Sequence, residues 1–281
     1  MSSRDDHRPE WQPGVAWLFC PADRPDRYVK ALALADIVVL DLEDAVAPDR
    51  RALAREHVRD LARDGRWDAA RTVVRINGVG TPDHGPALEL LAGVEAAAVM
   101  LAKCESAQDV EALAVDRVVP LIETPLGVEN AGLIAAAGSV SAVMWGADDL
   151  VAGLGGFASR GRDGLYRDVA RYARSRVLVA AKAHGRLAVD AVFMEIPDED
   201  GLRAETEDAL AVGFDAKVAI HPRQVPVLRE AFTPAPDRVD WAARLLATVD
   251  AEGGVASFEG RMVDGPVFAQ AQRILRLAGR R

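Results

Sequence analysis

Two apolar stretches, each ending at a carboxylate, decide the predicted fold: Val118-Val119-Pro120-Leu121-Ile122-Glu123-Thr124 and Val143-Met144-Trp145-Gly146-Ala147-Asp148-Asp149-Leu150. A continuous apolar run is typical of a strand buried on both faces, as strands are in a parallel sheet that helices cover. The segment between them, residues 125–140, is about long enough for one crossover helix. The two stretches therefore predict neighbouring parallel strands whose acidic ends lie at the same edge of the sheet.

Two carboxylates that point at one place repel each other, so a positive group is expected between them. A divalent cation is the simplest candidate. Glu123 is one expected ligand, and the neighbouring strand supplies either Asp148 or Asp149, the other of which would cap the following turn. The simpler alternative for Glu123 is an acidic residue beside the start of a helix at Pro125. The matching carboxylates after the second stretch favour the metal site.

Composition indicates a globular chain with a mixed surface. The 281 residues are 50% hydrophobic, enough for one large barrel or two small domains. The net charge of −9 comes without a long basic run, which argues against nucleic acid or an anionic membrane as the main partner.

Cys20 and Cys104 are predicted to be reduced and buried. Residues 1–13 resemble neither a signal peptide nor an anchor, so we expect a cytoplasmic protein.

Short apolar runs alternate with longer amphipathic segments from Val15 onward, which is typical of repeated strand–helix units. Four amphipathic segments, residues 51–64, 107–114, 165–184 and 199–212, are predicted helices. The alternation predicts an α/β fold of the (β/α)8 TIM-barrel type, since no Gly-x-Gly-x-x-Gly follows the first run. The eight predicted strands are residues 15–20, 36–42, 72–77, 97–103, 117–124, 142–147, 187–194 and 217–221.

The last part of the chain departs from this alternation. We predict a barrel over residues 14–232 and a C-terminal helical extension over residues 233–281. The extension contains a predicted helix at residues 237–252 and a turn-rich lid at about residues 253–266, followed by a final helix.

Charged or polar residues stand at the end of nearly every predicted strand. The carboxyl ends of barrel strands share one face of the molecule, so these side chains are expected to form one site. They are Asp23, Arg24, Glu43, Asp44, Arg75, Asn77, Lys103, Glu105, Glu123, Asp148, Asp149, Glu195 and His221.

Six motifs in order resemble the citrate lyase beta-subunit family, which includes malyl-CoA, citramalyl-CoA and related hydroxyacyl-CoA lyases. The resemblance covers about residues 15–277, and no single motif is decisive. The motifs are Leu18-Phe19-Cys20-Pro21-Ala22-Asp23-Arg24-Pro25, Leu40-Asp41-Leu42-Glu43-Asp44-Ala45-Val46, Val74-Arg75-Ile76-Asn77, Ile122-Glu123-Thr124, Gly146-Ala147-Asp148-Asp149-Leu150 and Ala219-Ile220-His221-Pro222.

The resemblance implies a TIM barrel that usually assembles as a homotrimer, binds Mg²⁺, and makes or breaks a carbon–carbon bond between a CoA thioester enolate and a keto acid. It implies Glu123 and Asp149 as metal ligands and Arg75 as the partner of the enolate oxyanion. Asp264, in the lid, is implied to reach a neighbouring subunit's site and handle the proton. The residues implied to contact substrate or CoA are Phe19, Arg24, Lys30, Arg75, Glu123, Asp148, Ile220 and His221.

Several candidate site residues have more than one interpretation. Glu43 and Asp44 either order metal-bound water and Arg75 or catalyse directly. Arg75 could be an ion-pair partner of either acid, and Lys30 an ordinary surface lysine. Asp264 precedes Gly265-Pro266, which is ordinary turn chemistry.

Two further positions stay open. His221 could cap the following turn, contact CoA or act as a base, and Lys103 is either a pocket residue or a partner of Glu105. Ala22 and Glu195 depart from the family's usual glycine and aspartate, which leaves the acyl substrate undetermined.

The sequence thus predicts a Mg²⁺-dependent lyase that cleaves or forms a short 3-hydroxyacyl-CoA, such as malyl-, citramalyl- or hydroxymethylglutaryl-CoA. The products would be acetyl-CoA or propionyl-CoA and a keto acid. One alternative is a citrate lyase beta subunit that acts on a citryl thioester held by a carrier protein. The other is a non-catalytic acyl-CoA-binding subunit.

Overall fold

The structure is a computed structural model that describes residues 11–252 and 256–279. It divides into two compact units between Leu228 and Arg229, close to the predicted end of the barrel at residue 232.

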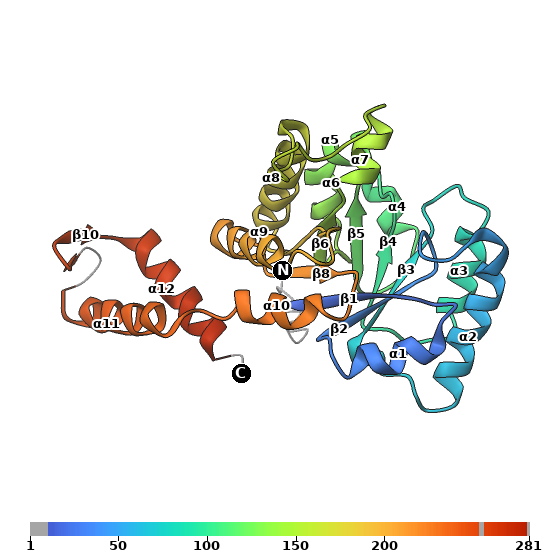
Figure 1. Cartoon of the computed structure of the whole chain (residues 1–281), viewed down its shortest axis with the longest axis horizontal. Helices are drawn as coiled ribbons and strands as arrows, with labels where there is room; N and C mark the ends of the chain where they lie inside the picture. Colours follow the sequence, from blue (N-terminus) through green and yellow to red (C-terminus); the bar gives the residue numbers. More distant parts are fainter. Residues whose placement is uncertain (1–10, 253–255, 280–281) are drawn as a thin grey trace, which may run out of the picture. The chain divides into compact units, whose positions relative to one another are not determined.

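Eight parallel strands close into a barrel in the first unit, which confirms the predicted fold class (Figure 1). Each strand pairs with its sequence neighbours, and β1 also pairs with β8, through Ala16, Trp17 and Leu18. All eight strands fall on predicted runs. They are β1 (Ala16–Pro21), β2 (Ile37–Asp41), β3 (Thr72–Ile76), β4 (Ala98–Leu101), β5 (Val118–Ile122), β6 (Ala142–Trp145), β7 (Leu187–Asp190) and β8 (Ala216–Ala219).

Helices connect the strands and lie outside the barrel (Figure 1). The predicted helix at residues 199–212 has the observed bounds, and the other three predictions differ only at their ends. The helices are α1 (Pro25–Leu32), α2 (Arg51–Arg63), α3 (His84–Leu91), α4 (Ala107–Glu111), α5 (Pro125–Glu129), α6 (Ala131–Ala136), α7 (Asp148–Gly153), α8 (Asp168–Ala183) and α9 (Glu199–Val212), with 3-10 turns at Pro48–Arg50 and Ala69–Arg71.

One connection differs from the prediction. The segment between β5 and β6 forms two short helices, α5 and α6, where a single crossover helix was expected. Thr124 caps the first helix by accepting a hydrogen bond from the amide of Gly127 at 3.0 Å. The helix ends at Glu129, and the side-chain amide of the next residue, Asn130, donates to the carbonyl of Glu105 at 2.8 Å. That bond ties the chain to the preceding loop, and α6 begins directly after it.

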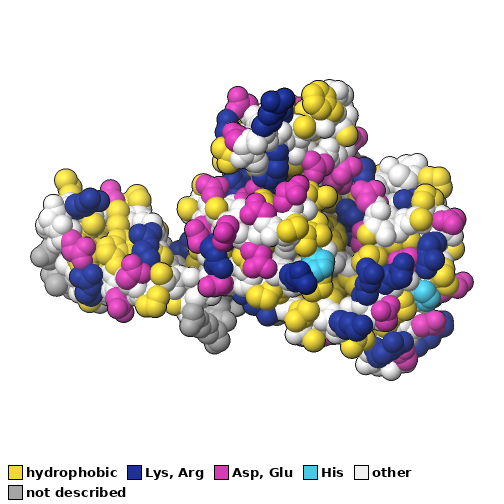
Figure 2. Space-filling view, viewed as in Figure 1, with side chains coloured by type: hydrophobic (Ala, Val, Ile, Leu, Met, Phe, Trp, Pro, Cys, Tyr) yellow, Lys and Arg dark blue, Asp and Glu magenta, His cyan; other side chains and the backbone are white. Residues whose placement is uncertain are grey.

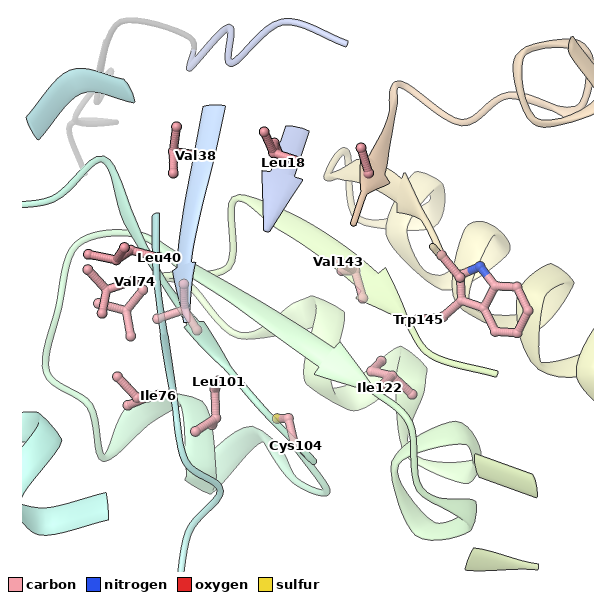
Figure 3. Close-up of a cluster of buried hydrophobic side chains, with 14 of the residues drawn as sticks. Leu18, Val38, Leu40, Val74, Ile76, Leu101, Cys104, Ile122, Val143 and Trp145 are labelled. Atoms are coloured by element: carbon pink, nitrogen blue, oxygen red, sulfur yellow. The ribbon is translucent and has the colours of Figure 1, made fainter. Parts of the chain in front are cut away.

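Alternate strand residues fill two separate apolar layers, as the period of a strand requires. One set, including Trp17, Val39 and Met144, fills the inside of the barrel. The other set faces the helices, and Figure 3 shows part of it, including Leu40, Val74 and Trp145. Cys20 and Cys104 are free thiols buried in this outer layer, as predicted. Burial raises the pKa of each thiol to about 12.

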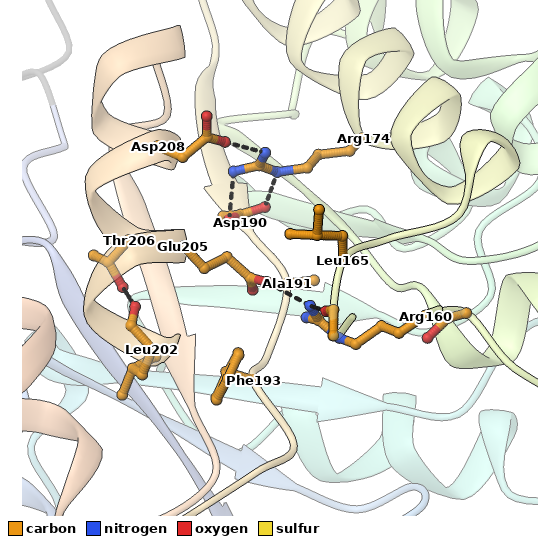
Figure 4. A network of polar contacts seen from close by, with 12 residues as sticks. Arg160, Leu165, Arg174, Asp190, Ala191, Phe193, Leu202, Glu205, Thr206 and Asp208 are labelled. Atoms are coloured by element: carbon orange, nitrogen blue, oxygen red, sulfur yellow. Dashed lines mark hydrogen bonds and ion pairs between the residues drawn. The ribbon is translucent and has the colours of Figure 1, made fainter. Parts of the chain in front are cut away.

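A buried ionic network fixes strands β7 and β8 to the helices outside them (Figure 4). Asp190, at the end of β7, is fully buried and accepts from Arg174 of α8 at 3.0 and 3.1 Å. It also accepts from Lys217 of β8 at 3.0 Å and from the indole of Trp145 at 2.7 Å. Lys217 donates as well to Glu205 of α9 at 2.9 Å. Every buried charge described here therefore has a partner on another element.

The second unit contains two helices and a hairpin. Helix α10 (Gln224–Ala231) spans the division and is followed by α11 (Pro236–Glu252) and α12 (Gly265–Ala278), whose apolar sides pack through Leu245, Phe268 and Ala271. The turn-rich lid was predicted without strands, but β9 (Ala256–Phe258) and β10 (Arg261–Val263) pair antiparallel. Residues 253–255 of the predicted lid lie outside the described residues.

Candidate active site

Polar side chains from four successive strands meet at the carboxyl end of the barrel. Asp41 and Glu43 belong to the end of β2, Arg75 to β3, Lys103 to the end of β4 and Glu123 to the end of β5. Asp41, Arg75 and Glu123 follow inward-facing residues at a spacing of two, so they point toward the barrel axis. The barrel brings residues of different strands into contact, such as Lys103 and Glu123, 20 positions apart, and Glu43 and Lys103, 60 positions apart.

Arg75 is held rigidly at the centre of this group. Its Nε and Nη2 donate to the two carboxylate oxygens of Asp41 at 2.7 and 2.6 Å, and its Nη1 lies 3.2 Å from Oε2 of Glu43. The ring of Phe19 lies 4.7 Å from the guanidinium carbon. Burial disfavours the charge of Arg75, but Asp41 and Glu43 outweigh it and raise its pKa. Arg75 is therefore a fixed cation.

Asp41 lies within one of the motifs at the strand ends, but no role was predicted for it. Its position was available from the strand period, because Asp41 lies two residues after the inward-facing Val39. A carboxylate on the inner face of a buried strand requires a positive partner, and Arg75 on the adjacent strand provides it.

Lys103 connects the two sides of the site. Its ammonium lies 2.5 Å from Oε1 of Glu43, 3.3 Å from Oδ2 of Asp44 and 3.4 Å from Oδ1 of Asp149. Its backbone amide donates to Oε1 of Glu123 at 3.1 Å. Of the two roles left open for Lys103, the structure supports the pocket residue. Burial disfavours the charge, but Glu43, Glu123 and Asp149 outweigh it and raise the pKa of Lys103.

Glu123 is almost completely buried, with 3% of its surface exposed. Burial first, and then the nearby Asp149, raise the pKa of Glu123 to about 8. Gly146 makes room for this carboxylate, because a Cβ on Gly146 would lie 2.8 Å from Oε2 and 2.9 Å from the Cβ of Glu123. The Asp149 carboxylate near the buried Glu123 carboxylate fits a divalent cation held between the two.

The donor set is small. The described residues contain no group of three or more His, Cys, Asp or Glu side chains arranged for a metal. Two carboxylates suit Mg²⁺, which commonly keeps water or substrate oxygens in its remaining positions. The two aspartates after β6 differ in their contacts. Oδ1 of Asp148 accepts from the hydroxyl of Ser159 at 2.6 Å, whereas Asp149 faces Lys103.

The other sequence candidates lie around this centre or elsewhere. Arg24 and Lys30 are exposed at the two ends of α1, where Figure 2 shows basic side chains gathered over α1 and α2. The amides of Ile220 and His221 donate to Oε1 of Gln224, and the imidazole of His221 accepts from the amide of Arg223 at 3.2 Å, which is a capping geometry. Asp264 belongs to the second unit, where it directly precedes α12.

The chain matches the HpcH/HpaI aldolase/citrate lyase family over residues 16–222, the part that forms the barrel and its site. It belongs to this family, as the motifs at the strand ends predicted.

Three relatives illustrate the activities within this family. Citrate lyase subunit beta-like protein of Mycobacterium tuberculosis is 52% identical over 95% of this chain and 96% of its own length. The L-malyl-CoA/beta-methylmalyl-CoA lyase of Cereibacter sphaeroides is 34% identical over 99% of this chain and 98% of its own. A (3S)-malyl-CoA thioesterase of the same species is 35% identical over 92% of each chain. The predicted lyase class is confirmed by the family and by the first two relatives.

A solved structure matches closely. Protein CitE from Mycobacterium tuberculosis, in complex with magnesium, acetoacetate and coenzyme A, superposes with a TM-score of 0.90 at 52% identity. The match covers 95% of this chain and 98% of that chain.

As for the membrane, none of the helices in the described residues combines the length and apolarity that crossing a bilayer requires.

Proposed function

We propose that the protein is a Mg²⁺-dependent lyase that cleaves a short 3-hydroxyacyl-CoA into acetyl-CoA or propionyl-CoA and a keto acid. The observation that carries this proposal is the fixed Arg75 cation in the same barrel mouth as the Glu123 and Asp149 carboxylates. Family membership and the malyl-CoA lyase relative support the carbon–carbon bond as the one that breaks.

Glu123 and Asp149 would hold the magnesium ion. When bound, it would orient the hydroxy acid end of the substrate and stabilise the carbonyl that develops there. Magnesium in the related CitE structure supports this assignment. Glu43 and Asp44 are assigned a supporting role, because Glu43 already lies against Arg75 and both acids lie against Lys103.

Arg75 would stabilise the enolate oxyanion of the departing thioester. Asp41 holds the guanidinium by two bonds on one side, so its orientation is set before the substrate arrives. A preorganised donor of this kind is worth about 10²–10³ in kcat.

Asp264 would protonate the enolate carbon in cleavage and remove the proton in synthesis. We assign it to the site of a neighbouring subunit in a homotrimer. The proposed substrate or CoA contacts are Phe19, Arg24, Lys30, Asp148, Ile220 and His221. Of these, Arg24 and Lys30 are proposed to contact the CoA phosphates. The exposed ends of α1 suit that role, because a phosphate group stays partly in water.

The test is an assay of the purified chain with malyl-CoA, citramalyl-CoA and hydroxymethylglutaryl-CoA, with Mg²⁺ or with EDTA. We expect release of keto acid and acetyl-CoA only with Mg²⁺, and a loss of about 10²-fold or more in Glu123→Ala and Arg75→Ala. Glu207→Ala, on the exposed side of α9, is the control that should retain activity. Turnover that persists in EDTA or in Glu123→Ala would contradict the metal role.

Hydrolysis of the same thioester is a second candidate, favoured by the malyl-CoA thioesterase relative. It would release a hydroxy acid and free CoA, so measuring keto acid and free thiol in the same reaction separates the two. A citryl thioester on a carrier protein is a further substrate to test, because one relative is citrate lyase beta-like.

A further inference from the structure

Lys103 has an unusual backbone conformation for a residue with a long side chain. Its φ is +51°, in the left-handed region, two residues after the end of β4. Glycine adopts this region freely, whereas a Cβ makes it unfavourable. Such outliers persist when surrounding contacts hold them, and they gather at functional sites. The left-handed turn allows one residue to serve both sides of the site, with its amide toward Glu123 and its ammonium toward Glu43.

Lys103 and Arg75 contact different carboxylate oxygens of Glu43 and share its negative charge. Oε1 of Glu43 faces the ammonium of Lys103 at 2.5 Å, while Oε2 lies 3.2 Å from Nη1 of Arg75 and accepts from the amide of Asp44 at 3.0 Å. Without Lys103, the whole charge of Glu43 would act on Arg75. A guanidinium neutralised by both Asp41 and Glu43 has less positive charge to offer an oxyanion.

The same ammonium also acts on the proposed metal ligand Asp149, at 3.4 Å from Oδ1. A fixed positive charge in contact with a ligand carboxylate opposes the binding of a divalent cation there.

We propose that Lys103 is a positioning residue that balances Glu43, so that Arg75 keeps its charge for the substrate, and that it limits the affinity of the Glu123–Asp149 pair for divalent cations. The inference rests on the proposed function, because it concerns the same metal ligands and the same arginine. It differs from a purely structural role in the direction of its effects. A scaffold lysine, when removed, would disorder the carboxylates and weaken cation binding, whereas a competing charge, when removed, strengthens it.

The first experiment is calorimetric titration of the full chain with Mg²⁺, together with kcat. For Lys103→Met we expect Mg²⁺ to bind about threefold to tenfold more tightly, since a screened like charge is removed, while kcat falls by at least about tenfold. Lys103→Arg keeps the charge and should stay close to the parent chain in Mg²⁺ affinity. Weaker or unchanged Mg²⁺ binding in Lys103→Met would overturn the proposal.

The second experiment is thermal melting in EDTA, which needs neither metal nor activity. Lys103→Met should melt below the parent chain, because Glu43, Asp44 and Asp149 lose their shared cation. Lys103→Gly should melt above Lys103→Met, because glycine relieves the left-handed backbone while the lost charge is the same. Ala114→Gly is the matched control, since Ala114 also has φ of +51° but is exposed, three residues after the end of α4.

The two experiments test different parts of the proposal, so each can contradict its own part independently. If the parent chain binds no Mg²⁺, the proposed metal role is wrong, and the melting comparison still decides whether Lys103 balances the carboxylates. If Lys103→Met melts at or above the parent temperature, the charge balance is wrong, whatever the titration gives.

Discussion

Single residues decide whether the two proposed metal ligands can share one place. Glu123 is buried to the point that its pKa rises to about 8, which is costly for a carboxylate unless a cation compensates. The space for its carboxylate exists because position 146 has no side chain. Glycine is therefore required at position 146 by the space that the Glu123 carboxylate occupies, and not by its backbone φ angle.

Gly146→Ala should remove the cation site while leaving the fold. The added Cβ would displace the Glu123 carboxylate, which lies 2.8 Å away. We expect the parent chain to gain stability with Mg²⁺, by about 2.7 kcal/mol at one hundred times Kd, and Gly146→Ala to gain little. Melting with and without Mg²⁺ measures this. Gly138→Ala is the control, because a Cβ there meets nothing within 4 Å. An equal Mg²⁺ shift in both variants would show that position 146 does not matter.

At the scale of elements, the ionic network behind β7 and β8 fixes the last quarter of the barrel. Asp190 joins β7 to α8, and Lys217 joins β8 to α9 through Glu205. Burial disfavours the charge of Asp190, but Lys217 and Arg174 outweigh it and lower its pKa. Removing one partner from such a network leaves a buried charge unpaired.

Asp190→Asn should therefore destabilise the chain by about 3–5 kcal/mol at pH 7 in urea unfolding. Asp208→Asn is a matched control, because Asp208 also binds Arg174, at 2.6 Å, but is exposed, and it should cost at most about 1 kcal/mol. The lowered pKa of Asp190 means that its contribution is present above about pH 4 and is lost as the pH falls further. The difference between parent and Asp190→Asn should narrow there. Equal costs for both variants would contradict the network's role.

At the scale of the whole molecule, the proposed reaction needs Asp264, which belongs to the second compact unit. The resemblance assigns this residue to the site of a neighbouring subunit, so the active assembly would be a closed ring in which every site draws on two chains. This arrangement is heterologous, since each subunit gives one surface and receives another.

Mixing two inactive variants tests this sharing. Asp264→Ala and Glu123→Ala should each be inactive, and co-expressed in equal amounts they should recover about a quarter of the parent activity, because independent assortment leaves both residues intact at one site in four. Glu123→Ala mixed with Asp149→Ala should recover nothing, since both ligands come from one chain. Failure of the first mixture to recover activity would place Asp264 in its own subunit's site, and an active Asp264→Ala variant would place it outside the chemistry.

The sequence by itself determined the barrel and the identity of most polar residues at its mouth. Strand period and apolar runs are local properties, so β1 to β8 and the bounds of α9 followed from the chain without knowledge of its partners. The apolar runs placed Glu123 and the two aspartates after β6 at adjacent strand ends and predicted a cation between them, whereas the resemblance implied Asp149 as the second ligand.

Only the tertiary structure decided which charges meet. Asp41 holds Arg75, Lys103 bridges Glu43 and Asp149, and Asp148 turns to Ser159, and each choice depends on side chains distant in sequence. The left-handed turn at Lys103 and the hairpin of β9 and β10 were also missed. The physical reason is that a local pattern encodes which face is buried, whereas the partner of a charge depends on how the closed barrel places distant strand ends.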